Sequence, residues 1–277
     1  MFRDYNNAFP QSDIAMRHLS LVRMFPSVYL KDTLENNKIR ETINCEMTKR
    51  NCTYLAYGRP GFYKKPTVMF DDTKDENRLS FSQVCLLINS ENIGKFESYF
   101  FDTGAFFDGV YQKEGFLTKF DNNPGHESIS IFKIGNSMDD IMSYICILYS
   151  NMRDYYEGNL KVDIDSDCCL LQEIVSLAKN TGNKFVDIWG IKGDLWHKSV
   201  EIQALEALQV EGVVEAMIVS DDYRDQLSQG SDKVFAMAKR MNIKVIEVES
   251  HKLVRRRSFA KALRSAVRKY YNKKGVL

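Results

Sequence analysis

The pattern of apolar and polar positions predicts a chain that mixes strands with helices. Alternating or continuous apolar segments predict strands over 14–20, 38–43, 52–57, 84–88, 185–191, 200–203, 213–219 and 243–248. Apolar positions three or four residues apart predict helices over 25–37, 137–157, 167–180, 221–241 and 253–272. Strands and helices do not alternate regularly, so we expect an α+β fold with a mixed or antiparallel sheet and peripheral helices.

One predicted strand carries a carboxylate at its centre. In the segment 199–203, Val200 and Ile202 share one face, and Glu201 and Gln203 share the other with Ser199. The two polar side chains would therefore project side by side from a rigid element. An ordinary solvent-facing strand shows the same pattern, so both interpretations stay open on spacing alone.

Composition excludes several classes of protein. The 277 residues are 44% hydrophobic and 12% aromatic, which is enough for a packed core. The six cysteines form no C-x-x-C pair and only four histidines are present, which argues against a zinc ribbon or a disulfide framework. The polar N-terminus does not resemble a signal peptide, and no apolar run reaches the ~18 residues that span a bilayer. We therefore expect a cytoplasmic protein without a membrane segment.

The net charge of +1 hides an uneven distribution. Residues 251–277 contain ten Lys or Arg and no Asp or Glu, which leaves the rest of the chain with a surplus of nine acidic residues. The predicted last helix has an apolar stripe at Phe259, Leu263, Val267 and Tyr270, surrounded by these cations. This pattern suits a helix that packs on the body of the protein and offers phosphates its other face. A basic solvated helix is the alternative.

Three further segments could carry chemistry. His18 and Ser20 would point to one face of the first predicted strand, although a lone strand histidine is often only structural. Arg59 lies in a Gly-Arg-Pro-Gly turn beside Tyr54 and Tyr57, which suits an anionic or planar ligand. A structural turn with a buried tyrosine fits that turn equally well. The triplet 102–104, Asp-Thr-Gly, is typical of a turn that caps its own backbone.

Taken in order, these segments resemble the ADP-ribosyltransferase superfamily, and most closely its DarT-like toxins that modify nucleic acid. The resemblance rests on His18-x-Ser20, on Tyr57-Gly58-Arg59, and on Glu201-Ile-Gln-Ala followed by the strand 214–219. These short motifs are scattered over residues 14–250. The chain departs from arginine-specific members at Ser199, where they have Gln or Glu two residues before the glutamate.

The resemblance implies a fold, a co-substrate and roles for individual residues. It implies split β-sheets in a catalytic domain over 1–250, with 251–277 as a basic helix packed on it. Glu201 would bind the 2′-hydroxyl of the nicotinamide ribose of NAD, and Arg59 would hold the pyrophosphate or steer the acceptor. The implied cofactor-binding residues are His18 and Ser20 at the adenosine ribose, Tyr57 in preference to Tyr54 at nicotinamide, and Gln203. No metal is implied.

The acceptor implied by the resemblance and by the basic C-terminus is RNA or single-stranded DNA. A toxin or anti-phage effector would also imply a neutralising antitoxin as partner. Two alternatives stay open, namely a transferase that modifies protein or only hydrolyses NAD, and a non-catalytic module that binds nucleic acid. A nuclease would need Asp102, Glu127, Asp139 and Asp140 to hold Mg²⁺, but Asp139 and Asp140 would lie on different faces of a helix.

Overall fold

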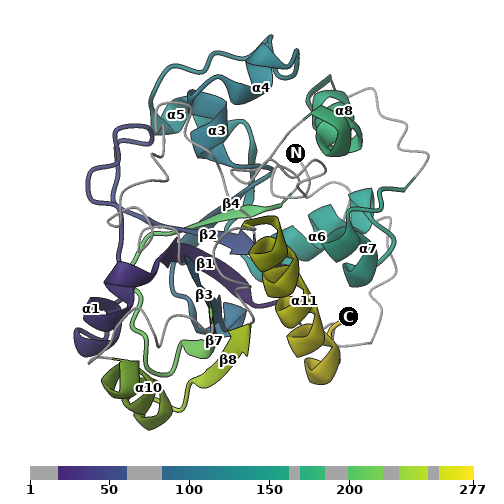
Figure 1. Ribbon diagram of the computed structural model, residues 1–277. Helices are drawn as coiled ribbons and strands as arrows, with labels where there is room; N and C mark the ends of the chain where they lie inside the picture. The colour runs from purple at the N-terminus through teal and green to yellow at the C-terminus, as the bar shows by residue number, and fades with distance from the viewer. Residues whose placement is uncertain (1–17, 61–82, 162–168, 185–198, 221–230, 249–255) are drawn as a thin grey trace.

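The structure is a computed structural model that describes residues 18–60, 83–161, 169–184, 199–220, 231–248 and 256–277 (Figure 1). These ranges form an α+β protein with one eight-stranded sheet in the order β5-β4-β6-β2-β1-β3-β7-β8. The strands are β1 Leu21–Pro26, β2 Thr53–Tyr57, β3 Gln83–Ile88, β4 Phe96–Tyr99, β5 Lys133–Gly135, β6 Glu201–Ala204, β7 Val214–Ser220 and β8 Lys244–Val248. The predicted strand 185–191 and helical segment 221–230 lie outside the described residues.

The sheet is mixed, which confirms the predicted fold class. All of its neighbouring strands pair antiparallel except β7 and β8, which pair parallel. Parallel neighbours need a crossover connection, and the chain between them contains α10 (Ser231–Arg240), which packs against β8.

A narrow junction divides the sheet into two halves. β1 and β2 share only two paired positions, Leu21 with Tyr57 and Val22 with Ala56, whereas β1 and β3 share six. One half is therefore β5-β4-β6-β2 and the other is β1-β3-β7-β8. The resemblance implied split sheets, but the described strands form one connected sheet with a two-residue contact at its centre.

Helices surround both halves (Figure 1). They are α1 Leu30–Glu35, α3 Thr103–Phe107, α4 Val110–Lys113, α5 His126–Ser130, α6 Met138–Leu148, α7 Met152–Glu157, α8 Cys169–Lys184, α10 and α11 Arg256–Lys274. The group α3, α4 and α5 lies at one end, α1 and α10 lie together at another, and α11 packs on β7 and β8. Within the described residues, no helix combines the length and apolarity that a membrane span requires.

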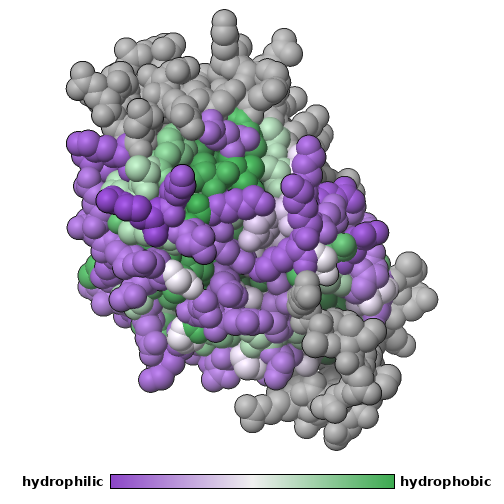
Figure 2. Space-filling view, turned by 90° about the horizontal axis from the view of Figure 1, so that it is seen from below, coloured by the Kyte–Doolittle hydropathy of each residue, from purple (hydrophilic) through white to green (hydrophobic). Residues whose placement is uncertain are grey.

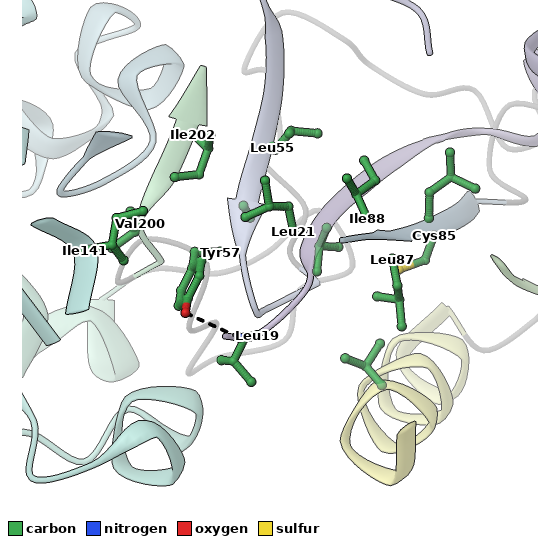
Figure 3. Packing of buried hydrophobic residues seen from close by; sticks show 14 of the residues in the cluster. Leu19, Leu21, Leu55, Tyr57, Cys85, Leu87, Ile88, Ile141, Val200 and Ile202 are labelled. Carbon is green, nitrogen blue, oxygen red and sulfur yellow. Dashed lines mark hydrogen bonds between the residues drawn. The ribbon is translucent and has the colours of Figure 1, made fainter. Parts of the chain in front are cut away.

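The hydrophobic core runs through the junction. Figure 3 shows Leu19, Tyr57, Val200 and Ile141 packed beneath β2 and β6, with a hydrogen bond from the Leu19 amide to the Tyr57 hydroxyl. The last helix contributes Leu263, Val267 and Tyr271, all fully buried, so its buried stripe ends at Tyr271 where the sequence predicted Tyr270. By contrast, the face of the molecule in Figure 2 is largely hydrophilic.

Several sequence-based boundaries are wrong for identifiable reasons. The first described strand is Leu21–Pro26, after the predicted segment. The sequence pattern missed it because Arg23, which donates to the Tyr54 carbonyl at 2.8 Å, interrupts the apolar run. The segment 38–43 forms only isolated bridges at Lys38 and Thr42. The predicted helix 137–157 is two helices, α6 and α7, because Asn151 caps a new one. No element was predicted over 108–136, yet this segment contains α4, α5 and β5.

Close packing at the junction predicts that replacing Gly58 lowers the stability of the protein. Its φ of +74° lies in the left-handed region, and an added Cβ would overlap the Leu19 side chain. Gly115 has a φ of +84° with nothing within 4 Å, so it serves as the matched control for backbone strain alone. We expect Gly115→Ala to cost about 1 kcal/mol and Gly58→Ala about 2–4 kcal/mol, because the second also overpacks the core. Urea unfolding measures both, and equal losses would contradict the account.

Candidate functional site

Strand register places a row of polar side chains on one face of β2, β6 and β4. Gln203 pairs with Tyr54 on β2 and with Glu97 on β4, and Glu201 pairs with Tyr99. Paired residues point to the same face, so these five side chains share it. Glu201 and Gln203 therefore lie side by side, as their spacing predicted, but they are buried rather than facing solvent.

Glu201 is the centre of this row. Its carboxylate accepts hydrogen bonds from the Thr103 amide at 3.0 Å, the Thr103 hydroxyl at 2.6 Å and the Gln203 side-chain amide at 2.8 Å. Thr103 is the first residue of α3, and the side chain of Asp102 caps that helix by accepting from the Ala105 amide at 3.0 Å. The predicted backbone cap at 102–104 is thus confirmed, and it orients a helix N-terminus toward the carboxylate.

The environment of Glu201 changes its proton affinity. Burial raises its pKa from the ordinary 4.5 to about 8, and the nearby Asp102 carboxylate adds to the rise. The hydrogen bonds from Gln203 and Thr103 favour the ionised form but only partly offset the burial. Glu201 is therefore poised to change charge near neutral pH, a property concentrated in functional sites.

Gln203 connects Glu201 to an arginine that the sequence analysis did not select. Its Oε1 atom accepts from Nε of Arg50 at 3.1 Å and from a terminal nitrogen of the same guanidinium. Its Nε2 atom donates to Glu201 and to the Thr103 hydroxyl, the latter at 3.1 Å. The amide thus has its oxygen toward the cation and its nitrogen toward the carboxylate.

Glu97 anchors Arg50 from the neighbouring strand. The Glu97 carboxylate forms ion pairs with Arg50 and with Lys133, the latter at 2.7 Å, and contacts Nε2 of His126 at 3.0 Å. The Tyr99 hydroxyl donates to it at 2.8 Å. Burial alone would raise the pKa of Glu97, but hydrogen bonds from Lys133, Tyr99, Arg50 and His126 hold it well below its usual range.

A cavity of about 500 Å³ borders this network, and we call it the His126 cavity. Its lining residues are Thr48, Lys49, Arg50, Pro124, Gly125, His126, Glu127 and Ser128. Glu201 does not line it. Instead Arg50 lines the cavity and reaches Glu201 through Gln203, so the carboxylate and the cavity are two hydrogen-bonded steps apart.

Tyr57 and His18 lie on the opposite side of the sheet from Glu201. The Tyr57 amide donates to the Val200 carbonyl, so the Tyr57 ring points away from the Glu201 face. The Tyr57 hydroxyl lies 3.4 Å from Nδ1 of His18 and 3.8 Å from the Met142 sulfur of α6. Burial lowers the pKa of His18, although Glu91 and Asp139 act in the opposite direction.

Arg59 and Ser20 also belong to that side and have internal partners. Arg59 is 2% exposed, donates to the Tyr156 carbonyl at 3.1 Å, and stacks 4.1 Å above the Tyr155 ring. The Ser20 hydroxyl donates to Glu215 of β7. Arg59 therefore stabilises the packing of α7 at the junction, and Ser20 connects the start of β1 with β7.

Tyr54 shares the Glu201 face but faces a different partner. Its hydroxyl lies 3.1 Å from the Thr48 hydroxyl and 3.1 Å from the Cys45 sulfur. The structure thus brings together Glu201, Gln203 and Tyr54, and separates them from His18, Ser20, Tyr57 and Arg59. The implied roles require His18, Tyr57, Arg59 and Glu201 to meet at one cleft. The structure does not bring them together, because β-strand alternation puts Tyr57 and Glu201 on opposite faces.

Sequence reasoning missed Arg50, Glu97, Thr103 and His126 as members of the network. Only Thr103 gave a signal, as part of the polar triplet between aromatic pairs. Among the described residues, no three His, Cys, Asp or Glu side chains are grouped so that they could hold a metal ion. The chain matches no family model, no curated protein and no solved structure.

The raised pKa of Glu201 predicts a pH-dependent stability difference. A raised folded-state pKa contributes stability that is complete below about 4.5 and is lost as the pH rises toward about 8. Glu201→Gln cannot titrate, so the stability of the wild type relative to this variant should fall by about 1 kcal/mol per pH unit between pH 5 and pH 8. Urea unfolding at several pH values measures the difference.

Glu97→Gln is the matched control for that experiment. The pKa of Glu97 is lowered, so its contribution is present above 4.5 and is lost only at more acidic pH. The cost of Glu97→Gln should therefore be constant between pH 5 and pH 8. A flat profile for Glu201→Gln as well would mean that Glu201 is ionised throughout this range.

Proposed function

We propose that this chain is an NAD-dependent ADP-ribosyltransferase that uses Glu201 as its catalytic carboxylate and nucleic acid as its acceptor. The observation that carries the proposal is the Glu201 carboxylate itself, 4% exposed on a central strand and held by Gln203 and Thr103. Buried carboxylates with strongly shifted pKa values and fixed orientation are concentrated at functional sites. The narrow junction of the sheet and the resemblance of the Glu201 strand support the same assignment.

The reaction suits a carboxylate in this setting. The bond between nicotinamide and ribose breaks, its electron pair leaves with nicotinamide, and the acceptor's nucleophilic atom bonds to the ribose carbon and loses its proton. Positive charge develops on the ribose in the transition state, as in glycoside hydrolysis. A preoriented anion such as ionised Glu201 stabilises that charge, and a group of this kind typically contributes about 3 kcal/mol.

The bound co-substrate would itself ionise Glu201. The nicotinamide ring of NAD is cationic, and a cation near a carboxyl group lowers its pKa. Glu201 would therefore be neutral in the free protein at pH 7 and would release its proton when the ring arrives. Gln203 and Thr103 would then keep the anion oriented through the hydrogen bonds that they already form.

Arg50 takes, in this proposal, the arginine role that the resemblance gave to Arg59. Arg50 contacts Gln203 and lines the cavity, whereas Arg59 is buried against Tyr155 and Tyr156. The cofactor roles of His18, Ser20, Tyr57 and Tyr54 are not carried over. The Tyr57 ring, for example, is 0% exposed and packs on Tyr155, so it offers no face to nicotinamide.

Nucleic acid is proposed as acceptor because of α11. Lys269 and Lys273 are exposed on this helix, while Arg268 pairs with Glu157 and Lys274 pairs with Glu215. The exposed lysines leave part of the helix free to contact phosphates. A role as a cytoplasmic toxin or anti-phage effector with an antitoxin partner belongs to the same proposal and rests on the resemblance.

One observation favours a second candidate, a nucleic-acid-binding module without catalysis. The Glu201 carboxylate accepts three hydrogen bonds from within the chain and does not line the His126 cavity. When every member of a buried polar network is hydrogen-bonded, the network needs no role beyond specifying the fold. The two candidates differ in whether the protein releases nicotinamide from NAD.

The first test is the Glu201→Gln variant, which keeps the size of the side chain and removes its charge. We expect nicotinamide release from NAD to fall at least ~100-fold, because a group of this kind contributes about 3 kcal/mol to the transition state. Circular dichroism checks the fold, and Glu206→Gln, at an exposed glutamate in the loop after the same strand, is the matched control. Equal rates for the variants, or no release by the wild type, would favour the binding module.

The second test concerns the acceptor. Replacing Lys269 and Lys273 by Gln should reduce transfer of labelled ADP-ribose to RNA or single-stranded DNA about tenfold at moderate salt, because two phosphate contacts are lost. Nicotinamide release into water should not change. Lys31→Gln with Lys95→Gln removes the same charge from exposed positions elsewhere. Label found on protein rather than nucleic acid would contradict the proposed acceptor.

A further inference from the structure

The His126 cavity has the features of a binding site in its own right. Its volume of about 500 Å³ is in the range of small-ligand sites. Two separate segments form its wall, residues 48–50 from the loop before β2 and residues 124–128 around the start of α5. Neither segment contains a residue to which the resemblance gave a role.

The electrostatics of the cavity favour an anion. Among the lining residues, Lys49 and Arg50 supply two cations and Glu127 supplies one carboxylate. The Glu97 carboxylate is already bonded to Arg50, Lys133, His126 and Tyr99, so its charge is largely neutralised. The structure describes no ion pair to Lys49, whose side chain is exposed at the cavity.

Contacts within the chain hold the cationic wall in place. The Lys49 amide donates to the Cys45 carbonyl at 2.7 Å, and the Cys45 amide donates to the Arg50 carbonyl at 3.1 Å. Lys49 has a φ of +58°, a conformation that only a tightly constrained turn imposes on a lysine. The Arg50 side chain is 19% exposed, and its guanidinium is held by Glu97 and Gln203. Such preorganisation reduces the entropic cost of binding.

The other residues that line the cavity indicate which kind of anion it would bind. Ser128 adds a hydroxyl group and His126 adds an imidazole, both of which can donate to phosphate oxygens. The buried Thr48 hydroxyl is bonded to Tyr54. No Phe, Tyr or Trp is among the described lining residues, and the flat groups that remain, the His126 ring and the Arg50 guanidinium, are both engaged with Glu97. Recognition would therefore depend on the charged group and not on the base.

We propose that the His126 cavity binds the phosphate group of a nucleotide, with Arg50 and Lys49 as its main ligands and without selectivity for the base. This inference shares Arg50 with the transferase proposal, but phosphate binding is measured without NAD turnover, so either proposal can fail while the other stands. A free mononucleotide and the 5′ end of a nucleic acid strand supply the same chemistry, and the experiment separates them.

Isothermal titration calorimetry on the full chain tests the proposal with AMP, inorganic pyrophosphate and adenosine. AMP and pyrophosphate should bind and weaken as salt rises, and adenosine should not bind. Lys49→Asn should weaken binding about tenfold, since it removes a cation while Asn tolerates the left-handed backbone. Glu127→Gln should strengthen binding several-fold by removing a carboxylate from the lining. Lys95→Gln, at a side chain that is 83% exposed, is the control and should change nothing.

One more variant and one more ligand complete the binding experiment. Arg50→Gln should abolish binding, and circular dichroism shows whether that variant keeps its fold, while the Lys49 and Glu127 variants test the site in any case. A 5′-phosphorylated hexanucleotide that binds more tightly than AMP identifies a strand end as the source, and equal affinity identifies the mononucleotide. Absence of binding by AMP and pyrophosphate, or equal affinities in wild type, Lys49→Asn and Glu127→Gln, overturns the proposal.

Discussion

The burial of one carboxylate constrains a large part of this structure. Removing an unpaired carboxylate from water costs several kcal/mol, so Glu201 can occupy a central strand only if donors reach it. Those donors are the Thr103 amide and hydroxyl and the Gln203 amide. The position of α3 over β6 follows, because its first N–H group must point at the carboxylate. Gln203 in turn needs Arg50, and Arg50 needs Glu97 on β4, so the constraint extends across three elements.

The narrow junction of the sheet places a second constraint on the other side of the strands. Where β1 and β2 separate, backbone groups lose strand partners and must be satisfied otherwise. The Gly58 amide donates to the Ser20 carbonyl at 3.1 Å, and the Tyr271 hydroxyl of α11 donates to the same carbonyl. The Tyr155 hydroxyl donates to the Tyr57 carbonyl and accepts from the Val200 amide. The motifs around Ser20, Tyr57 and Arg59 thus join the two halves of the sheet and dock α7 and α11.

The sequence predicted the features that depend on a local pattern of apolar residues. It did not predict the features that depend on contacts between segments far apart in the chain. The strands β2, β3, β6, β7 and β8 follow from apolar runs or alternation, and so does the shared face of Glu201 and Gln203. The burial of the face that carries Glu201 and Gln203 could not be predicted. It depends on the aromatic-rich segment after β4, which folds back and brings Thr103 onto Glu201. Arg50 and His126 lie in segments without periodicity, and only the pairing of β4 with β6 brings their partner Glu97 beside Gln203. The same register separates Tyr57 from Glu201, although their strands are neighbours.

Two carboxylates on one face of neighbouring strands have opposite proton affinities, and this contrast links the cavity to Glu201. Glu97 is surrounded by cations and stays ionised, while Glu201 is surrounded by neutral donors beside Asp102 and holds its proton to about pH 8. Carboxylates whose environments drive their pKa values apart commonly divide the work of a site between them. Here the ionised Glu97 fixes Arg50 at the cavity. The neutral Glu201 can still lose its proton when a cation comes close. Gln203 contacts both Arg50 and Glu201, so a single side-chain amide connects the cation at the cavity with the buried carboxyl group.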